Sequence, residues 1–173
     1  MTEPRREISA CFTGHRLLTK EQLHSLLPTI SETVVSLWGR GITHYYAGGA
    51  LGFDLAASVA VLNLKQRLPS LMLTLALPCR NHQKGWGRLD RELFDGVMAR
   101  ADATVYVNDA YFRGCMQRRN CYMVDRSSIC VTYLTERRGG TYQTVRYAER
   151  KGLPILNLAG SFTGEQLCFD DML

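Results

Sequence analysis

Six short apolar runs, rich in β-branched and aromatic residues, alternate with longer helix-like stretches along this 173-residue chain. The runs lie at 7–12, 42–48, 71–77, 103–108, 128–134 and 153–158. Each is short enough to be a strand that is buried on both faces of a sheet. Strands that alternate with helices pair in parallel through right-handed crossovers. The pattern therefore predicts an α/β domain with a mostly parallel sheet of about six strands and helices on both faces.

The stretches between the runs predict five helices. In the first, apolar residues follow i, i+3, i+4, i+7 spacing from Leu23 to Leu37, after a capping-box signature formed by Thr19 and Gln22. Pro28 lies inside this helix, where it removes a backbone donor and clashes with the preceding turn, so a kink or a break is expected there. The other helices are expected at about 52–67, 88–100, 115–126 and 141–151.

Length and charge limit the classes of protein to consider. A chain of 173 residues with 46% apolar residues can bury one sizeable core, so a single domain over 1–173 is expected. The formal charge of +5, with arginines gathered around 113–119, 137–138 and 146–150, favours anionic partners such as nucleotides or nucleic acid. A modest basic excess also serves solubility alone.

The cysteines and the lengths of the apolar runs indicate a cytoplasmic protein. The six cysteines are scattered, without a C-x-x-C pair or a histidine at zinc spacing, so a reduced protein without a metal site is expected. His15 and His82 are interpreted as hydrogen-bonding loop residues rather than metal ligands. The N-terminus lacks the apolar core of a signal peptide, and no apolar run approaches the ~18 residues of a membrane span.

Polar or glycine-rich segments follow five of the predicted strands. They are "TGHR" (13–16), "GGALGFD" (48–54), "PCRNHQKGW" (78–86), "NDAYFRG" (108–114) and "ERRGGT" (136–141). The carboxyl ends of parallel strands share one edge of the sheet, and ligands of open α/β sheets bind at that edge. The sequence therefore predicts a ligand site built from these segments.

The turn Gly139-Gly140-Thr141 leads from a strand into a helix, so its bare backbone N–H groups can bind an anion such as a phosphate. Gly48 and Gly49 occupy a similar place after the second strand, where glycine allows a close approach of the backbone to a ligand. Glycines after strands are also ordinary turn residues. Because "GGALGFD" departs from the G-x-G-x-x-G fingerprint, neither an NAD site nor any other cofactor is predicted.

Other candidate residues have a structural interpretation beside the functional one. Asp54 could bond a ribose hydroxyl, or it could sit in the first helical turn because the helix dipole favours an acid there. Trp86, in a polar loop with Gln83, could stack on a planar ligand or close the core. Arg119 and Asn120 lie near the start of a helix, where the guanidinium could fork onto a phosphate or carboxylate.

Taken together, these segments resemble the SLOG superfamily, the Rossmann-like group that unites the DNA-processing protein DprA with the Lonely Guy enzymes, and within it the YpsA-like branch. The resemblance rests on "FTGHR", "GGALGFD", Pro78 with Gln83 and Trp86, Arg119 and Asn120 with Met123 and Asp125, and "GGT" at 139–141. These segments run from residue 11 to about 158. The resemblance implies a Rossmann-like three-layer fold, a nucleotide-type ligand across the carboxyl edge of the sheet, and a homodimer.

The same resemblance bears on catalysis. Lonely Guy hydrolases carry a G-G-x-G-T-x-x-E motif whose glutamate assists cleavage between base and ribose 5′-phosphate. If Gly140 and Thr141 match the G-T of that motif, the glutamate position is Thr144 here, and a hydroxyl cannot replace a carboxylate in that role. Glu136 and Glu149 fall elsewhere. The turn is therefore predicted to hold a ligand rather than cut it, and no catalytic residue is assigned.

The sequence thus favours a cytoplasmic sensor or regulatory protein that binds a nucleotide or a nucleotide-derived, ADP-ribose-like ligand. The expected ligand-binding residues are Thr13, Gly14, Arg16, Gly48, Gly49, Asp54, Gln83, Trp86, Arg119, Asn120, Gly139, Gly140 and Thr141. One alternative is a nucleoside-phosphate glycohydrolase that uses Asp54 or Asp109 as its acid. A second, less favoured alternative is a DprA-like module for single-stranded DNA, in which Tyr111 and Phe112 lie among arginines.

Overall fold

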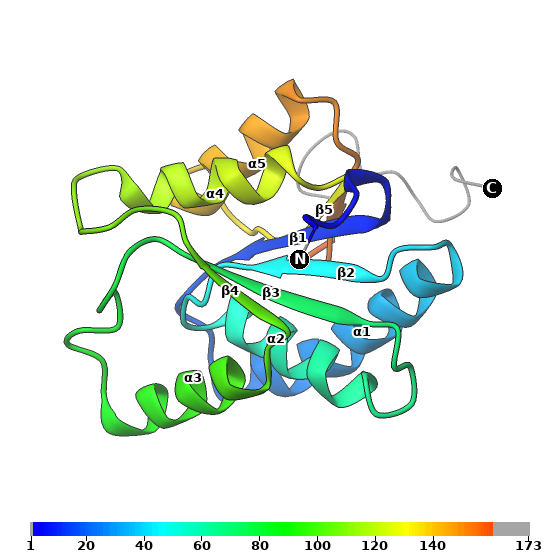
Figure 1. Cartoon of the computed structure of the whole chain (residues 1–173), viewed down its shortest axis with the longest axis horizontal. Helices are drawn as coiled ribbons and strands as arrows, with labels where there is room; N and C mark the ends of the chain where they lie inside the picture. The colour runs from blue at the N-terminus through cyan, green and yellow to red at the C-terminus, as the bar shows by residue number, and fades with distance from the viewer. Residues whose placement is uncertain (1, 161–173) are drawn as a thin grey trace.

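A parallel sheet of six strands runs through the centre of the computed structural model, which describes residues 2–160 (Figure 1). Its strands are β1 (Ser9–Gly14), β2 (His44–Ala47), β3 (Met72–Leu77), β4 (Ala103–Tyr106), β5 (Ile129–Tyr133) and β6 (Ile155–Asn157), in the spatial order β4-β3-β2-β1-β5-β6. All five pairings are parallel. The predicted α/β class, the parallel sheet and its six strands are confirmed.

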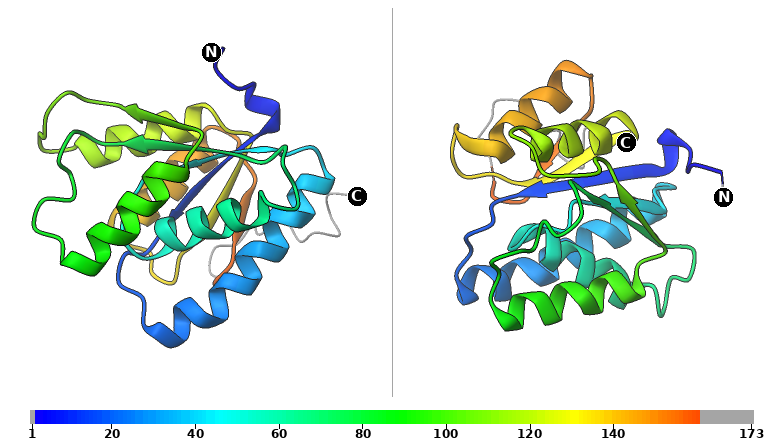
Figure 2. Two further views of the ribbon diagram at one scale, coloured as in Figure 1. Left: turned by 60° about the horizontal axis from the view of Figure 1, so that its bottom comes forward. Right: turned by 60° about the vertical axis from the view of Figure 1, so that its left-hand side comes forward.

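Five helices cover the two faces of this sheet (Figures 1 and 2). One face carries α1 (Lys20–Gly39), α2 (Phe53–Leu64) and α3 (Arg88–Arg100), and the other carries α4 (Cys115–Asp125) and α5 (Gly139–Arg150); a short 3-10 helix, η1 (Arg6–Ile8), precedes β1. Alternate residues of β1 enter the two cores: Phe12 packs in the cluster with α1 to α3, and Cys11 packs in the cluster under α4 and α5. The fold is thus a Rossmann-like sandwich of three layers.

The first helix begins as its sequence predicts. The Thr19 side chain accepts a hydrogen bond from the Gln22 backbone N–H (3.1 Å), and the Gln22 side chain accepts one from the Thr19 N–H (2.8 Å), which completes the capping box. Of the kink or break expected at Pro28, the break does not occur, because α1 continues through the proline to Gly39. A proline removes only one bond of the helical ladder, and buried residues on both sides of it, such as Leu26 and Ile30, hold the helix against the core.

The strand order places a switch point beside β1. From β1 the chain moves outward through β2, β3 and β4, and then returns to pair β5 on the other side of β1. The helices that follow β1 and β5 consequently lie on opposite faces of the sheet (Figure 2). This divergence opens a crevice at the carboxyl ends of β1 and β5, which is the usual ligand position in open α/β sheets.

The described residues contain no membrane-spanning helix, and their cysteines are unpaired. No helix between residues 2 and 160 is long and apolar enough to cross a membrane. Five cysteines in this range, Cys11, Cys79, Cys115, Cys121 and Cys130, are free thiols, and Cys168 lies outside the described residues.

Candidate ligand site

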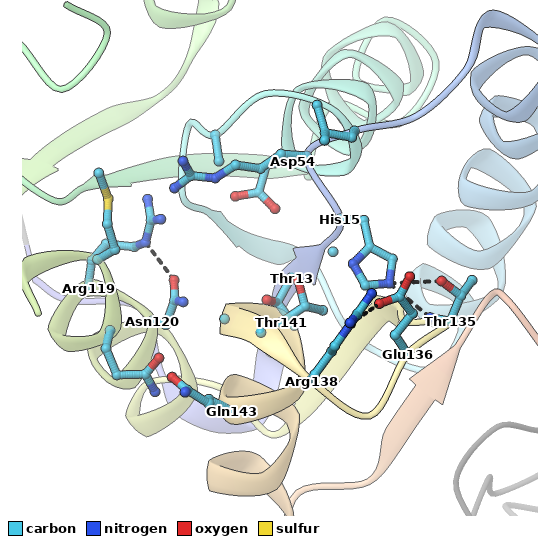
Figure 3. Close-up of a pocket in the computed structure, with 18 of the residues that line it drawn as sticks. Thr13, His15, Asp54, Arg119, Asn120, Thr135, Glu136, Arg138, Thr141 and Gln143 are labelled. Carbon is cyan, nitrogen blue, oxygen red and sulfur yellow. Dashed lines mark hydrogen bonds and ion pairs between the residues drawn. The ribbon is translucent and has the colours of Figure 1, made fainter.

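A cavity of about 910 Å³ lies at the carboxyl ends of β1 and β5 (Figure 3). Its lining comes from the end of β1 and the following loop (13–17), from Gln22, from Ala50 and Asp54, from the start of α4 (Gly114, Met116, Gln117, Arg119, Asn120), and from the β5–α5 segment (Thr135, Glu136, Arg138, Gly139, Gly140, Thr141, Gln143). The volume falls within the range of small-molecule sites. The cavity therefore occupies the crevice that the strand order creates.

The N-terminus of α5 opens into this cavity without a side-chain cap. Its N-cap residue, Arg138, makes no capping hydrogen bond, and within residues 2–160 no group outside the helix accepts the backbone N–H of Gly139, Gly140 or Thr141. The first turn of an α-helix always leaves such donors unpaired, and the helix dipole adds partial positive charge there. In contrast to the capped start of α1, the start of α5 is chemically ready for an anion.

Backbone conformation explains the first glycine of this turn but not the second. Gly139 has a φ of +84°, a conformation that side chains disfavour, so the backbone itself calls for glycine there. Gly140 has no positive φ, and a Cβ built on it would meet nothing within 4 Å. The protein fold alone therefore gives no reason for glycine at 140, whereas a ligand that approaches the backbone would.

Thr13 adds an unpaired hydroxyl to the same place. Its side chain is only 5% exposed, lines the cavity, and forms no hydrogen bond with any described residue. Thr141 lines the cavity as well, and in the view of Figure 3 the two threonines overlap near the start of α5. Thr132, which is in register with Thr13 on β5, also has a buried hydroxyl without a described partner. Because the Thr13 hydroxyl lines the cavity and has no described partner, it is available to an acceptor group of a ligand.

The rim of the cavity is formed by the β5–α5 segment and the loop after β1. The His15 Nε2 atom accepts the backbone N–H of Thr135 at 2.9 Å, so a neutral His15 ring carries its proton on Nδ1. The Arg138 Nε atom donates to the Glu136 carboxylate at 2.6 Å, and this hydrogen bond holds the pKa of Glu136 below its usual value. Both charged side chains line the cavity and offer a donor and an acceptor to a ligand.

Deeper in the wall, a buried network joins α4 to the loop after β2. Arg119, 3% exposed, donates through Nη1 to the carbonyl oxygens of Gly48 and Ala76, and through Nε to Asn120 (2.7 Å). The Gly48 N–H donates to the Asp54 carboxylate at 3.1 Å. A Cβ on Gly48 would come within 2.4 Å of the Arg119 guanidinium. Glycine is therefore required at 48 by this packing.

The two charges of this network affect each other. Burial raises the pKa of the Asp54 carboxyl to about 6, while Arg119 and the backbone N–H groups of Gly48 and Ala50 oppose the rise. Burial also lowers the pKa of the Arg119 guanidinium, and Asp54 opposes that change. The Asp54 carboxylate accepts a hydrogen bond from the Gly48 backbone, which supports a structural role for Asp54 over a contact with a ribose hydroxyl. Asp54 nevertheless lines the cavity.

Thr144, the residue matched to the motif glutamate, lies behind the wall of the cavity. Its side chain is 1% exposed and does not line the cavity. The hydroxyl donates to the Gly140 carbonyl oxygen (2.9 Å) and accepts from the Asn120 side-chain amide (2.8 Å). This hydroxyl thus ties α5 to α4.

The loop after β3 stays outside the cavity. Trp86 packs edge-on against Phe94 and His82, with ring centroids 5.7 and 5.4 Å apart, beside the core under α3. Gln83 belongs to the same loop, and Gly49, with a φ of +66°, accepts a hydrogen bond from the His82 ring at 3.3 Å. The Trp86 contacts match the interpretation of a tryptophan that closes the core.

The structure therefore brings together nine of the thirteen expected residues: Thr13, Gly14, Arg16, Asp54, Arg119, Asn120, Gly139, Gly140 and Thr141. Gly48, Gly49, Gln83 and Trp86 do not line the cavity. Sequence reasoning assigned no ligand role to His15, Thr135, Glu136 or Arg138, although all four follow strand ends. It also gave no role to Gln22, which reaches the cavity from α1 and for which the sequence holds no signal.

The described residues offer this cavity no metal centre, since no group of three or more histidine, cysteine, aspartate or glutamate side chains is placed to hold an ion. Its charged lining consists of three arginines, Arg16, Arg119 and Arg138, against two acids, Asp54 and Glu136, which gives a formal charge of +1. An anionic organic ligand suits such a lining better than a cation does.

A Rossmann-like sheet with a cavity and a helix N-terminus at its switch point defines the general class of α/β proteins that bind ligands at the carboxyl edge. Within that class, residues 17–156 match the YpsA model, which describes the YspA SLOG family, and the chain belongs to this family. It is 23% identical over 140 residues to UPF0398 protein YpsA of Bacillus subtilis, covering 77% of this chain and 78% of that protein.

Solved structures with the same fold include two DNA-processing proteins. DprA of Helicobacter pylori, whose structure concerns its single-stranded DNA binding mode, has a TM-score of 0.62 and 16% identity, over 92% of this chain and 68% of that one. DprA of Streptococcus pneumoniae has a TM-score of 0.64 and 16% identity over 89% of this chain, which spans about half (51%) of that protein. At this identity the likeness shows a shared fold.

Proposed function

We propose that this chain binds a nucleotide or a nucleotide-derived, ADP-ribose-like ligand in the cavity at the ends of β1 and β5, and acts as a sensor or regulatory protein. The observation that carries the proposal is the uncapped start of α5, where Gly140 leaves the backbone open beside the unpaired hydroxyl of Thr13. A phosphate there would accept backbone N–H groups and both threonine hydroxyls, of Thr13 and Thr141.

The rest of the lining supports an organic phosphate. Glu136 offers a carboxylate that can accept sugar hydroxyls, and Arg16 and Arg138 add positive charge at the mouth. The volume of about 910 Å³ leaves room beyond one phosphate group for a sugar and a base. The cytoplasmic location, the homodimer and the extent of the domain over all 173 residues belong to the same proposal.

The first experiment compares ligands that differ in their phosphate. Melting temperatures are measured with AMP, ADP-ribose and, as the matched control, adenosine. At a concentration 100 times Kd a ligand stabilises by about 2.7 kcal/mol, so we expect a rise of about 5–10 °C for a chain of this size with AMP or ADP-ribose. Adenosine should give almost none. An equal shift with all three would contradict a phosphate site.

Nucleic acid is the second candidate ligand. Tyr111 and Phe112 are exposed beside Arg113 in the β4–α4 loop, and exposed aromatics among arginines are features that single-stranded binders use. Neither aromatic lines the cavity, so a strand would have to extend beyond the proposed phosphate site. A labelled oligonucleotide added to the same assay distinguishes the two: displacement by ADP-ribose at physiological salt would favour a shared site and this candidate.

We expect no hydrolysis of nucleoside monophosphates at enzymatic rates. Thr144 replaces the motif glutamate and uses its hydroxyl to join α4 and α5, and a neutral hydroxyl cannot stabilise a developing oxocarbenium charge as a carboxylate does. Of the acids named for the glycohydrolase alternative, Asp54 is bonded to the Gly48 backbone and Asp109 is exposed outside the cavity. Chromatography of AMP incubations checks this expectation; base release above about 1 per second would favour the enzyme.

A further inference from the structure

A second helix N-terminus, that of α4, opens into the same cavity. Gly114, its N-cap residue, has a φ of +99° and supplies no side-chain cap. The Cys115 N–H donates to the Phe112 carbonyl oxygen at 3.0 Å, but within the described range no group accepts the N–H of Met116 or Gln117. Gly114, Met116 and Gln117 all line the cavity. These donors resemble those at the start of α5.

A buried side chain one turn further along α4 points to a ligand independently. Arg119 is 3% exposed and lines the cavity, and its Nε and Nη1 atoms are bonded to Asn120, Gly48 and Ala76. Its Nη2 atom forms no hydrogen bond with a described residue. Figure 3 shows Arg119 on a different side of the cavity from Thr141. A guanidinium held by two of its nitrogens is pre-organised to donate through the third.

Charges around this place favour an anion as well. Asp54 offsets part of the Arg119 charge, but Arg16 lies near enough to influence the pKa of both groups. The positive end of the α4 dipole adds to the charge of these arginines. An anion at the start of α4 would therefore meet two arginines and two backbone N–H groups against one carboxylate.

We propose that the first turn of α4, together with Arg119, forms a second anion subsite, so that the cavity prefers ligands with two phosphate groups to ligands with one. This inference rests on the proposed function, because the first phosphate is assigned to α5. The two subsites lie on separate helices, which suits a ligand whose phosphates are adjacent or are carried at two positions of one nucleotide. Gln117, rather than Arg119, is the residue to vary, since Arg119 also holds the wall together.

The test measures the affinities of AMP, ADP and adenosine 3′,5′-bisphosphate by calorimetry. We expect one of the two-phosphate ligands to bind wild-type protein at least ~10-fold more tightly than AMP, the effect of one added favourable charge contact in a partly buried site. Gln117→Glu places a carboxylate in the first turn of α4 and should weaken the two-phosphate ligand much more than AMP, so that the preference is lost. Gln66→Glu makes the same charge change on an exposed residue after α2 and should keep the preference.

The outcomes separate this inference from the proposed function. Equal affinities for the three ligands, or a preference that survives Gln117→Glu, would overturn the second subsite and leave the α5 site standing. Absence of binding by all three would overturn both. Two subsites are supported by a specific pattern. Gly140→Asp loses AMP binding, whereas Gln117→Glu still binds AMP and loses the preference for two phosphates.

Discussion

Gly140→Asp is expected to abolish the ligand-induced rise in melting temperature while the melting of the ligand-free protein stays nearly unchanged. The ligand-free protein tolerates the change because Gly140 has no positive φ and a Cβ there meets nothing within 4 Å. An acid in the first helical turn is even favourable to the dipole, by about 0.3–1 kcal/mol. The same carboxylate occupies the open face of the turn and repels a phosphate. Thermal melting with and without ADP-ribose measures both effects.

Two control variants show which property of the new side chain acts. Gly140→Ala adds the Cβ without charge and should weaken binding less than aspartate does. Gly96→Asp makes the same substitution on the exposed face of α3, where a Cβ also meets nothing within 4 Å, and should keep the full ligand shift. A full ligand shift in Gly140→Asp would mean that the turn is not the phosphate site, and the proposed function would fail.

Arg119→Met should be the most destabilising of the variants considered, with a loss of about 3–5 kcal/mol of unfolding free energy at pH 8. The change removes the donors to the Gly48 and Ala76 carbonyl oxygens and leaves the Asp54 carboxylate buried without its positive neighbour. Methionine keeps most of the volume, so the loss reports chiefly the missing charge and hydrogen bonds. Arg118→Met, on the neighbouring exposed arginine, should stay within about 0.5 kcal/mol of wild type.

The loss in Arg119→Met should shrink as the pH falls from 8 to 5. Burial raises the pKa of Asp54 to about 6 in the folded protein, above its ordinary value of 3.8, so the folded state holds this proton more tightly than the unfolded chain does. Such a group adds stability as the pH falls from the folded pKa towards the unfolded one. Without Arg119 the folded pKa rises further, so the variant regains stability from a higher pH than wild type.

Urea unfolding at pH 8 and pH 5 measures the effect of Arg119→Met at both ends of this range. A neutral Asp54 carboxyl no longer needs a counter-charge, so the part of the loss that remains at pH 5 reports the missing hydrogen bonds. An equal loss at both pH values would show that Asp54 is not the group that Arg119 compensates.

The layers of this protein follow from local patterns in its sequence. Short apolar runs form buried strands, and the amphipathic stretches between them form helices that bury their apolar faces on the sheet. The order of these elements along the sequence therefore predicts the parallel sheet and its five helices. Local signals were equally direct, since the capping box of Thr19 and Gln22 needs only neighbouring residues. The glycine-rich turn before α5 was also predictable as a possible anion site, because unpaired donors at a helix start follow from backbone geometry alone. Pro28 does not break α1, because the packing of this helix outweighs one missing hydrogen bond.

Which strand ends meet depends on how distant elements pack in three dimensions. All five polar segments follow carboxyl ends, but the order β4-β3-β2-β1-β5-β6 opens a crevice only where helices leave for opposite faces, between β1 and β5. Hence Glu136 and Arg138 line the cavity, while Trp86, after β3, closes the core. Long-range packing likewise buried Arg119 against Gly48, 71 residues away, and turned Thr144 towards Asn120. Local periodicity holds no information about such contacts, because they depend on how separate elements pack and not on the spacing within one of them.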